Sequence, residues 1–405
     1  MQSGGQFFLR RMWSFSRALD LALVDEEVEK GFQVAVGEQH GERVAYIALS
    51  LGRELGWWGE DLFHLTIAGL LHDIGAIADF RRSHGDPVMM REHARIGAGL
   101  MTGFPAGEFL AAALWHHHAT PQAGQGDSGD ESVPQVARIL SLADKLDLQM
   151  PRRWINEEAR RHLVQWVLAG REQLFFPAEA DAFAALAGRE AFWLDLGQPD
   201  LPDIVWDYLA GSGVPLTMPV VNQDLAGLLA VTFAELVDQK SSFTARHSRA
   251  VAENVLQLAL KLGWDEAKCR EIYTAGLLHD LGKLAVPNKV LDKPGKLEAG
   301  EFAWVKRHTY YTYRLLKEAG FPQTTVEWAA FHHERRDGRG YPFGLKAGRL
   351  DTGCGLMKVA DIFAALTEER PYRKPMTAGE ALAIVAQEAG SGVDAEIVEL
   401  ARKVF

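Results

Sequence analysis

Cysteine is almost absent from this chain of 405 residues, which contains only Cys269 and Cys354. Two thiols cannot build a disulfide framework or a zinc site with several cysteine ligands, and they fit a reducing compartment. Long apolar runs are absent as well: no stretch approaches about 18 uncharged apolar residues, and the first residues lack the apolar core of a secretory signal. We therefore expect a cytoplasmic protein without a membrane partner.

An excess of positive charge is also missing, because 43 Lys and Arg residues stand against 54 Asp and Glu residues and give a net charge of −11. Binding to duplex nucleic acid draws most of its affinity from basic side chains on phosphates, so we expect no such partner. A small anionic ligand stays possible. The hydrophobic share of 47% and the charged share of 24% are typical of a folded chain, and the length favours two or three domains.

Alternating Val, Ile and Thr runs bounded by turn residues are scarce, which makes a large sheet improbable. Apolar residues recur instead at steps of three and four, the spacing of one face of a helix. Two segments show this spacing: Val44, Ala48, Leu51 and Leu55, and Val251, Val255, Leu258 and Leu262. The fold class that we predict is all-α.

The chain contains an internal duplication. Residues 40–75 align with residues 247–282 at a constant offset of 207, and the run AGLLHD occurs unchanged at 68–73 and 275–280. We therefore predict two tandem helical bundles. The first domain would span 1–212, a linker with two prolines would span 213–222, and the second domain would span 223–405.

Each copy contains a histidine, a His-Asp pair, another histidine, a His-His pair and a distant aspartate. In the second copy these residues are His247, His279, Asp280, His308, His332, His333 and Asp361. The corresponding residues that we assign in the first copy are His40, His72, Asp73, His93, His116, His117 and Asp144. Four other histidines match no position in the second copy, and we interpret them as structural: His64, His84, His118 and His162.

Imidazole nitrogens and carboxylate oxygens suit divalent Fe, Mn, Zn, Co or Ni. Six or seven such ligands are too many for one tetrahedral zinc ion, but they suit two metals that share a bridging carboxylate. Two metals could lower the pKa of a bridging water and hold both oxygens of a phosphoryl displacement. Any one of these histidines alone could simply be a core residue. Their recurrence in two copies favours metal binding in both.

Residues 223–375 resemble the HD-GYP domain of bacterial cyclic dinucleotide phosphodiesterases, a branch of the HD metallophosphohydrolase superfamily. The matching stretches are Thr244-x-x-His247, HDLGKLAVPNKVLDKPGKL (279–297), His308, HHERRDGRGYP (332–342) and ADIFAALTEERPYR (360–373). The resemblance implies hydrolysis of cyclic di-GMP or 3',3'-cyclic GMP-AMP to a linear dinucleotide. It implies two divalent metals, with Fe or Mn favoured over Ni, Co, Zn or Mg, held by the seven residues of the second copy.

The resemblance also implies roles for individual residues. Asp280 would bridge the metals, and Lys283 would bind and polarise the scissile phosphate. The nucleotide pocket would be lined by Tyr341, Pro342, Arg370 and Arg373. The loop that carries the GYP sequence is also a possible docking surface for signalling proteins.

Two departures from the family pattern bear on the number of metals and on the activity of the first copy. Some members hold a third metal through a glutamate four positions before the first histidine, where this chain has Phe243, so we expect two metals. The first copy resembles a plain HD domain, because Ala76 replaces the lysine and no GYP loop follows its histidines. We expect that copy to be a phosphomonoesterase or a ligand sensor that does not cleave cyclic dinucleotides. A less selective nucleotide phosphohydrolase, a 5'-nucleotidase, and a binding module without turnover are the alternatives for the whole chain.

Overall fold

The structure is a computed structural model that describes residues 4–30, 39–79, 87–122, 133–151, 155–214, 225–240, 246–369 and 374–405. These residues form helices joined by turns, and they contain isolated bridge pairs but no strand. The all-α prediction is confirmed. The Cα positions divide the chain into two compact units, Met1–Leu225 and Ala226–Phe405. The linker predicted at 213–222 lies mostly outside the described residues, and the domain limits that we gave stay predictions.

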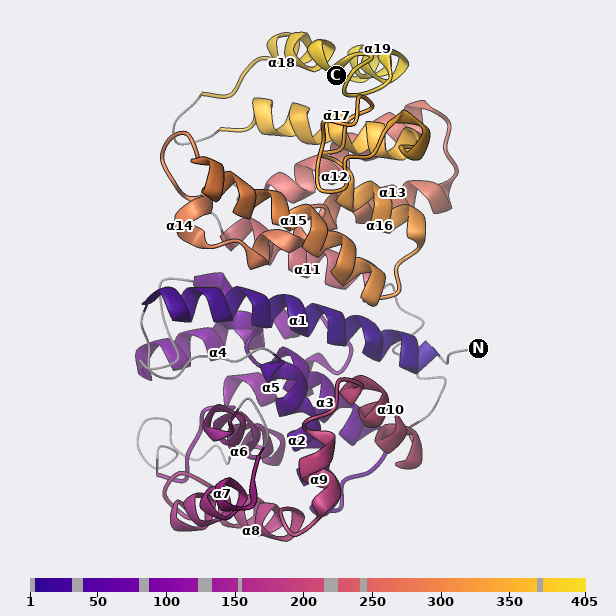
Figure 1. Ribbon diagram of the computed structural model, residues 1–405. Coiled ribbons are helices and arrows are strands. Elements are labelled where there is room, and N and C mark those ends of the chain that lie inside the picture. Colours follow the sequence, from indigo (N-terminus) through magenta and orange to yellow (C-terminus); the bar gives the residue numbers. More distant parts are fainter. Residues whose placement is uncertain are drawn as a thin grey trace. The chain divides into compact units, whose positions relative to one another are not determined.

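The first unit is drawn in indigo to magenta in Figure 1. Its elements, in chain order, are α1 (Gly4–Lys30), α2 (His40–Glu54), α3 (Glu60–Leu71), the 3-10 helix η1 (Ile74–Asp79), α4 (Pro87–Met101), α5 (Gly107–Trp115), α6 (Gln135–Gln149), α7 (Glu157–Ala169), α8 (Pro177–Leu186), α9 (Glu190–Asp195) and α10 (Leu201–Gly211).

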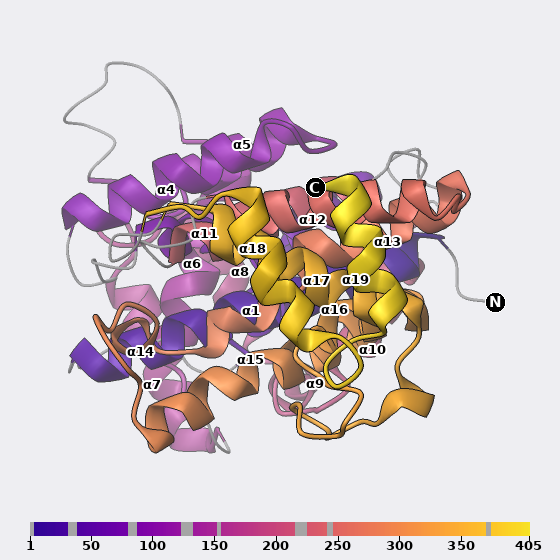
Figure 2. The same ribbon diagram turned by 90° about the horizontal axis from the view of Figure 1, so that it is seen from above.

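The second unit is drawn in salmon to yellow, and Figure 2 shows α18 and α19 beside α17. Its elements are α11 (Leu225–Lys240), α12 (His247–Lys261), α13 (Glu266–Leu278), η4 (Leu281–Ala285), α14 (Asn288–Leu291), α15 (Ala299–Glu318), α16 (Gln323–Ala330), η5 (Ala347–Arg349), α17 (Thr352–Thr367), α18 (Ala378–Val385), η6 (Ala386–Glu388) and α19 (Ala395–Val404).

The duplication in the sequence reappears as one order of elements in both units. The helices α2, α3, η1, α4, α5 and α6 correspond to α12, α13, η4, α15, α16 and α17. A glycine lets the central pair of helices approach in each unit. A Cβ on Gly69 would lie 2.6 Å from Cα of Ala45, and a Cβ on Gly276 would lie 2.6 Å from Cα of Ala252. Only glycine fits such a contact without a shift of the backbone.

The apolar faces that the sequence predicts form the core of each unit. Val251, Val255 and Leu258 are fully buried on α12, whereas Leu262 lies just past the helix end and is 42% exposed. Full burial of one such side chain contributes about 1.5–3 kcal/mol. The pattern therefore identified the core face correctly and extended it one turn too far.

Both units fix the first turn of the helix that begins with a candidate ligand. Asp20 accepts a hydrogen bond from the backbone N–H of Gly41 at 3.2 Å, and Asp238 accepts one from the N–H of Ser248 at 3.1 Å. An aspartate that accepts from the first N–H groups satisfies donors that the helix itself leaves free. A buried aspartate from the preceding helix thus fixes the first turn of both α2 and α12.

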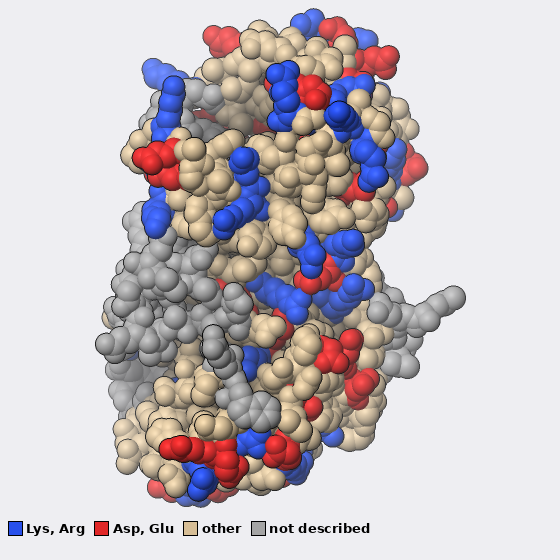
Figure 3. All heavy atoms as spheres, in the orientation of Figure 1, with Lys and Arg blue, Asp and Glu red and all other residues tan. Residues whose placement is uncertain are grey.

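The surface carries charges of both signs. On the face in Figure 3, Lys and Arg side chains are interspersed with Asp and Glu side chains on both units, and much of the described surface is neither. No helix in the described ranges combines the length and hydropathy that crossing a bilayer requires.

Candidate metal centres

In the second unit the folding brings together the side chains that the sequence singles out. His247 begins α12, Asp361 lies within α17, and His308 lies within α15. The two adjacent pairs, His279 with Asp280 and His332 with His333, directly follow the ends of α13 and α16. Five elements thus point ligand-type side chains at one buried point.

The carboxylate of Asp280 lies between two groups of histidines. Its Oδ2 is 3.2 Å from Nε2 of His279 and 3.9 Å from Nε2 of His247, and its Oδ1 is 3.4 Å from Nε2 of His308. The ligand atoms of His247, His279 and Asp280 lie within 4.8 Å of one another, as do those of His308, His332 and His333. This arrangement suits two cations joined by one bridging carboxylate.

Backbone carbonyls orient three of these rings. Nδ1 of His279, His308 and His332 lies 2.6–2.7 Å from the carbonyl oxygen three residues earlier. A ring that donates from Nδ1 to a carbonyl presents an unprotonated Nε2 to a metal. The helix ends therefore set the tautomer as well as the position of the ligands.

His247 is oriented by a carboxylate that the sequence analysis did not single out. Its Nδ1 lies 3.0 Å from Oε2 of Glu368, while its Nε2 lies 3.2 Å from Oδ1 of Asp361. Burial alone would lower the pKa of His247, but these two carboxylates outweigh burial and raise the pKa to about 9. A second carboxylate behind a histidine ligand is a common feature of metal sites.

The first unit repeats this geometry. Oδ2 of Asp73 is 3.3 Å from Nε2 of His72 and 3.5 Å from Nε2 of His40, and Oδ1 is 3.6 Å from Nε2 of His93. Oδ1 of Asp144 lies 3.4 Å from Nε2 of His40. The aspartate of the His-Asp pair thus lies between two histidine groups in both units.

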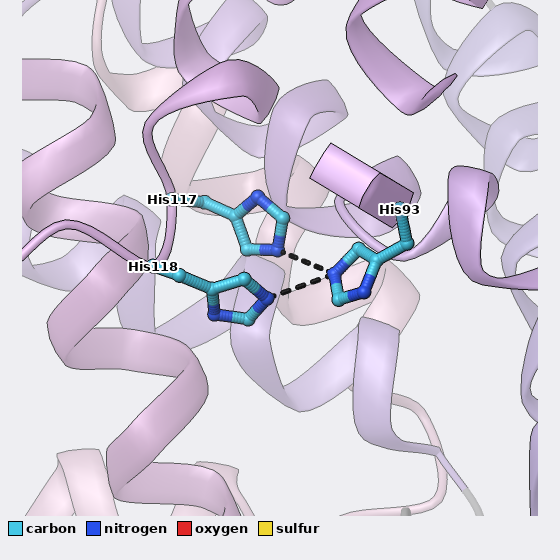
Figure 4. A group of neighbouring side chains, drawn as sticks. All are labelled: His93, His117 and His118. Atoms are coloured by element: carbon cyan, nitrogen blue, oxygen red, sulfur yellow. Dashed lines mark hydrogen bonds between the residues drawn. The ribbon is translucent and has the colours of Figure 1, made fainter. Parts of the chain in front are cut away.

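The structure places a different histidine than the predicted His116 beside His93 in the first unit. The histidines that meet His93 are His117, at 3.2 Å between Nε2 atoms, and His118, at 2.8 Å (Figure 4). Two groups of side chains in the described part of the first unit could hold a metal ion: His93 with His117 and His118, and His40 with His72 and Asp144. His116 belongs to neither group. It ends α5 in the backbone conformation that Phe331 adopts at the end of α16. The geometry therefore favours His118 over His116 as the third histidine of this group, and the choice between the two stays a prediction.

A constant offset could have revealed this register. His93 and His308 differ by 215 positions, and the same offset pairs His117 with His332 and His118 with His333. Choosing the first two of three consecutive histidines introduced a gap that the structure does not require.

In the first unit, Asp147 contacts Nδ1 of His40 as Glu368 contacts Nδ1 of His247 in the second unit. Its Oδ2 lies 2.7 Å from Nδ1 of His40, and its other oxygen accepts a hydrogen bond from the buried guanidinium of Arg43 at 2.5 Å. The hydrogen bond from the charged Arg43 fixes the carboxylate of Asp147 in place beside the His40 ring.

The donor sets fit divalent metals. Nε2 of His279 and Oδ1 of Asp144 are buried and make no hydrogen bond in the described structure, which is costly unless another group binds them. Burial also lowers the pKa of His117 and of His333 to about 3, so both imidazoles are neutral and able to act as ligands near neutral pH. Orphaned ligand atoms and neutral imidazoles are what a metal ion requires.

The glycine of each HD-x-G sequence has a packing role. A Cβ on Gly282 would lie 2.0 Å from the backbone oxygen of His308, and a Cβ on Gly75 would lie 2.0 Å from that of His93. Glycine lets the turn after the His-Asp pair touch the helix that carries the next histidine. This contact holds His308 close to Asp280 and His93 close to Asp73.

The second unit has two features at its site that the first lacks. The amino group of Lys283 forms an ion pair with Asp280, whereas the corresponding residue of the first unit is Ala76. Tyr341 and Pro342 follow His333 in a loop, and the ring of Tyr341 lies 4.9 Å from that of His333 between centroids. Arg370 and Arg373, predicted to line the same pocket, lie outside the described residues.

Glu334 ties the GYP loop to the end of α16. Its buried carboxylate accepts hydrogen bonds from the backbone N–H groups of Phe343, at 2.7 Å, and Leu345, at 2.9 Å. Within the loop, a Cβ on Gly340 would lie 2.5 Å from Cα of Glu334, so the loop packs directly against its own start. Tyr341 is thereby held beside the candidate metal ligands.

A buried His/Asp group inside each of two helical bundles defines the class: a metal-dependent phosphohydrolase of the HD type. HD domain families match residues 231–397 and, separately, residues 37–149. Over 404 residues the chain is 31% identical to 3'3'-cGAMP-specific phosphodiesterase 1 of Vibrio cholerae, covering 95% of this chain and 89% of that protein. The chain belongs to the HD-GYP family of phosphodiesterases, and it carries an additional HD domain before the HD-GYP domain.

A second relative agrees with this assignment, and a solved structure agrees with the fold. The chain is 41% identical over 155 residues to a cyclic di-GMP phosphodiesterase of Pseudomonas aeruginosa, covering 38% of this chain and 37% of that protein. The crystal structure of a cyclic GMP-AMP specific phosphodiesterase of V. cholerae aligns with a TM-score of 0.65 at 24% identity. That alignment covers 98% of this chain and 97% of the other, and it supports the tandem helical fold.

Proposed function

We propose that the second unit hydrolyses a cyclic dinucleotide, cyclic di-GMP or 3',3'-cyclic GMP-AMP, to the linear dinucleotide. The observation that carries this proposal is the combination of a complete His/Asp set with Lys283 and the GYP loop in one unit. Relatives named for each of these two substrates support the substrate class. They leave the preference between the two substrates open to experiment.

The proposed metal ligands of the second unit are His247, His279, Asp280, His308, His332, His333 and Asp361. Two divalent ions, with Fe or Mn favoured, would supply an activated water and neutralise charge on the phosphoryl oxygens. The chain's own part is to fix the ligands: Asp280 spans the two histidine groups, and Glu368 orients His247.

Lys283 and Tyr341 are the groups proposed to act on the substrate. The Lys283 side chain is 21% exposed and its amino group lies at the carboxylate of Asp280, so a phosphate oxygen that enters there meets a positive charge. Tyr341 offers a ring face beside His333, where the rest of a dinucleotide would lie. We propose that Pro342, Arg370 and Arg373 complete this pocket.

For the first unit we propose a second metal site formed by His40, His72, Asp73, His93, His117, His118 and Asp144. Ala76 gives this site no lysine, and its histidines are followed by no GYP loop. A selective site for a cyclic dinucleotide needs groups beyond the metals to hold the half that does not react. We therefore propose that the first unit acts as a phosphomonoesterase or a sensor and does not open the ring.

Three further proposals complete this picture. The domains would span 1–212 and 223–405, joined by a linker at 213–222. The GYP loop would also serve as a docking surface for signalling proteins, since Phe343 is 42% exposed there. The protein would be cytoplasmic, in line with its two free, buried cysteines.

The decisive experiment is anaerobic purification with metal analysis, followed by chromatography of products from cyclic di-GMP, 3',3'-cyclic GMP-AMP, linear dinucleotides and mononucleotides. We expect a linear dinucleotide from at least one cyclic substrate. Release of orthophosphate from mononucleotides without ring opening would identify the nucleotide phosphohydrolase instead. Binding without any product would identify a binding module.

A further inference from the structure

An open pocket of about 480 Å³ lies in the first unit, away from its metal site. Its walls come from the end of α2, from α9 with the turn before it, and from α10. The proposed ligand His40 begins α2, whereas the pocket residue Arg53 lies 13 residues further along the same helix. At the rise of an α-helix this separation is roughly 20 Å. None of the proposed metal ligands lines the pocket, so it is a feature separate from the metal centre.

The floor of the pocket is rigid and aromatic. The hydroxyls of Tyr46 and Tyr208 both donate to Oδ2 of Asp195, at 2.7 Å and 2.9 Å. Tyr46 also stacks on Phe192, with 5.8 Å between centroids and 17° between ring planes. Side chains fixed in this way lose little freedom when a ligand binds, so the site is already organised for one.

Two arginines, Arg53 and Arg189, and one glutamate, Glu54, line the pocket, so the positive charges exceed the negative charge there. The guanidinium of Arg53 lies 4.4 Å from the ring centroid of Tyr208, and within the described ranges no carboxylate forms an ion pair with it. The other arginine at the rim, Arg189, pairs with Glu54. One arginine is thus balanced and one is available for an anion.

Two adjacent tryptophans form the remaining wall. Trp57 is fixed by a hydrogen bond from its indole N–H to Oε1 of Gln135 at 3.0 Å. Trp58 is 63% exposed, and no other large hydrophobic side chain in the described structure is more exposed. A planar ring that stacks on an exposed indole removes apolar surface from water, and nucleobases bind in this way on aromatic side chains.

We propose that this pocket binds a nucleoside monophosphate, with the base stacked on Trp58 and the phosphate paired with Arg53. The volume is within the range of sites for small organic ligands. The combination of an aromatic wall and an arginine without a carboxylate partner matches a ligand that is planar at one end and anionic at the other. This site is independent of the cyclic dinucleotide chemistry proposed above.

The test measures binding of guanosine 5'-monophosphate to the full-length protein by calorimetry, before and after removal of metal with a chelator. We expect binding in both states. The variants Arg53→Met and Trp58→Ala should each weaken it at least tenfold, because each removes one end of the ligand's contacts. Guanosine and inorganic phosphate, the two halves of the probe, should each bind at least tenfold more weakly than the whole.

Arg161→Met is the matched control, since Arg161 is an exposed arginine on α7 that pairs with Glu157 and does not line the pocket. It should leave the affinity unchanged. Both test residues are exposed, and an unchanged thermal unfolding midpoint would show that their variants are folded. The proposal is overturned if the nucleotide does not bind, if binding disappears with the metals, or if Arg53→Met and Trp58→Ala bind as tightly as the control.

Discussion

Oδ1 of Asp280 lies 3.4 Å from Nε2 of His308, while its Oδ2 faces His279 on the other side of the site. One carboxylate therefore connects two groups of ligands that come from different helices. Asp73 has the same relationship to His93 and His72 in the first unit. The duplication has thus preserved the arrangement of these side chains in addition to the residue types.

The variant Asp280→Ala should abolish hydrolysis of cyclic dinucleotides. It removes the group that holds both ions in register, so we expect turnover to fall more than tenfold, a loss above about 1.4 kcal/mol in transition-state stabilisation. Asp73→Ala is the matched control at the same position of the first unit, and it should leave ring opening intact. Turnover of cyclic di-GMP and of cyclic GMP-AMP would be measured for both. An equal loss in the two variants would contradict a single catalytic unit.

His118 and His116 provide a direct test of the register in the first unit. His118→Ala should lower the metal content of anaerobically reconstituted protein, because its Nε2 lies beside that of His93. His116→Ala should retain the wild-type content, which approaches four ions per chain if both sites hold two. Elemental analysis of the two proteins would show which of the two histidines is a metal ligand. Loss of metal in His116→Ala alone would restore the original assignment.

Much of this site could be predicted from local sequence. The repeated AGLLHD run placed both His-Asp pairs, and the helical spacing of apolar residues identified the buried faces of α2 and α12. The triple histidine was harder, because three identical neighbours give no sign of which two follow the end of the helix. That choice depends on where α5 ends, and helix ends depend on packing as much as on sequence.

The carboxylates behind the ligands could not be found by alignment of the two copies. Asp147 lies three residues after Asp144, whereas Glu368 lies seven residues after Asp361. The first is still on its helix and the second is just past the helix end, yet each reaches Nδ1 of the first histidine. Equivalent contacts from unequal positions arise only in three dimensions.

Glu368→Gln should weaken metal binding in the second unit by about 10- to 100-fold, the usual cost of removing a group that orients a ligand. In the metal-free protein His247, with a pKa of about 9, is protonated at pH 7, and a metal can bind only after that proton leaves. Metal affinity should therefore rise with pH from neutral towards pH 9. Losing Glu368 removes one carboxylate that supports the proton, so the rise should move to lower pH.

Titration with Mn at several pH values would measure both effects in the same protein. Asp147→Asn, the corresponding change in the first unit, is the control, and it should leave the second site as it was. A Glu368→Gln protein with unchanged affinity and an unchanged pH profile would show that the contact to His247 has no part in metal binding.

Gly282→Ala should destabilise the second unit. Its new Cβ would lie 2.0 Å from the backbone oxygen of His308, so the turn and α15 would have to separate. Forced contacts of this kind typically cost about 1–3 kcal/mol. Gly300→Ala is the control, because a Cβ there meets no atom within 4 Å. Urea unfolding of both proteins would give the difference, and similar midpoints would refute the packing role.

Lys283 is proposed to bind the substrate and not the metals, and Lys283→Met tests that proposal. The substitution keeps a long side chain but removes the charge proposed to meet a phosphate oxygen. Loss of one such preorganised group typically lowers the rate about a hundredfold, or about 2.7 kcal/mol.

Metal content should not change, because Asp280 keeps its contacts with His279 and His308. Burial raises the pKa of Asp280, but the charges of His279 and Lys283 outweigh burial and hold this pKa well below its usual range. Parallel kinetics and elemental analysis would therefore show a slow enzyme with a full complement of metal. Loss of metal together with activity would instead make Lys283 a structural support of the ligand set.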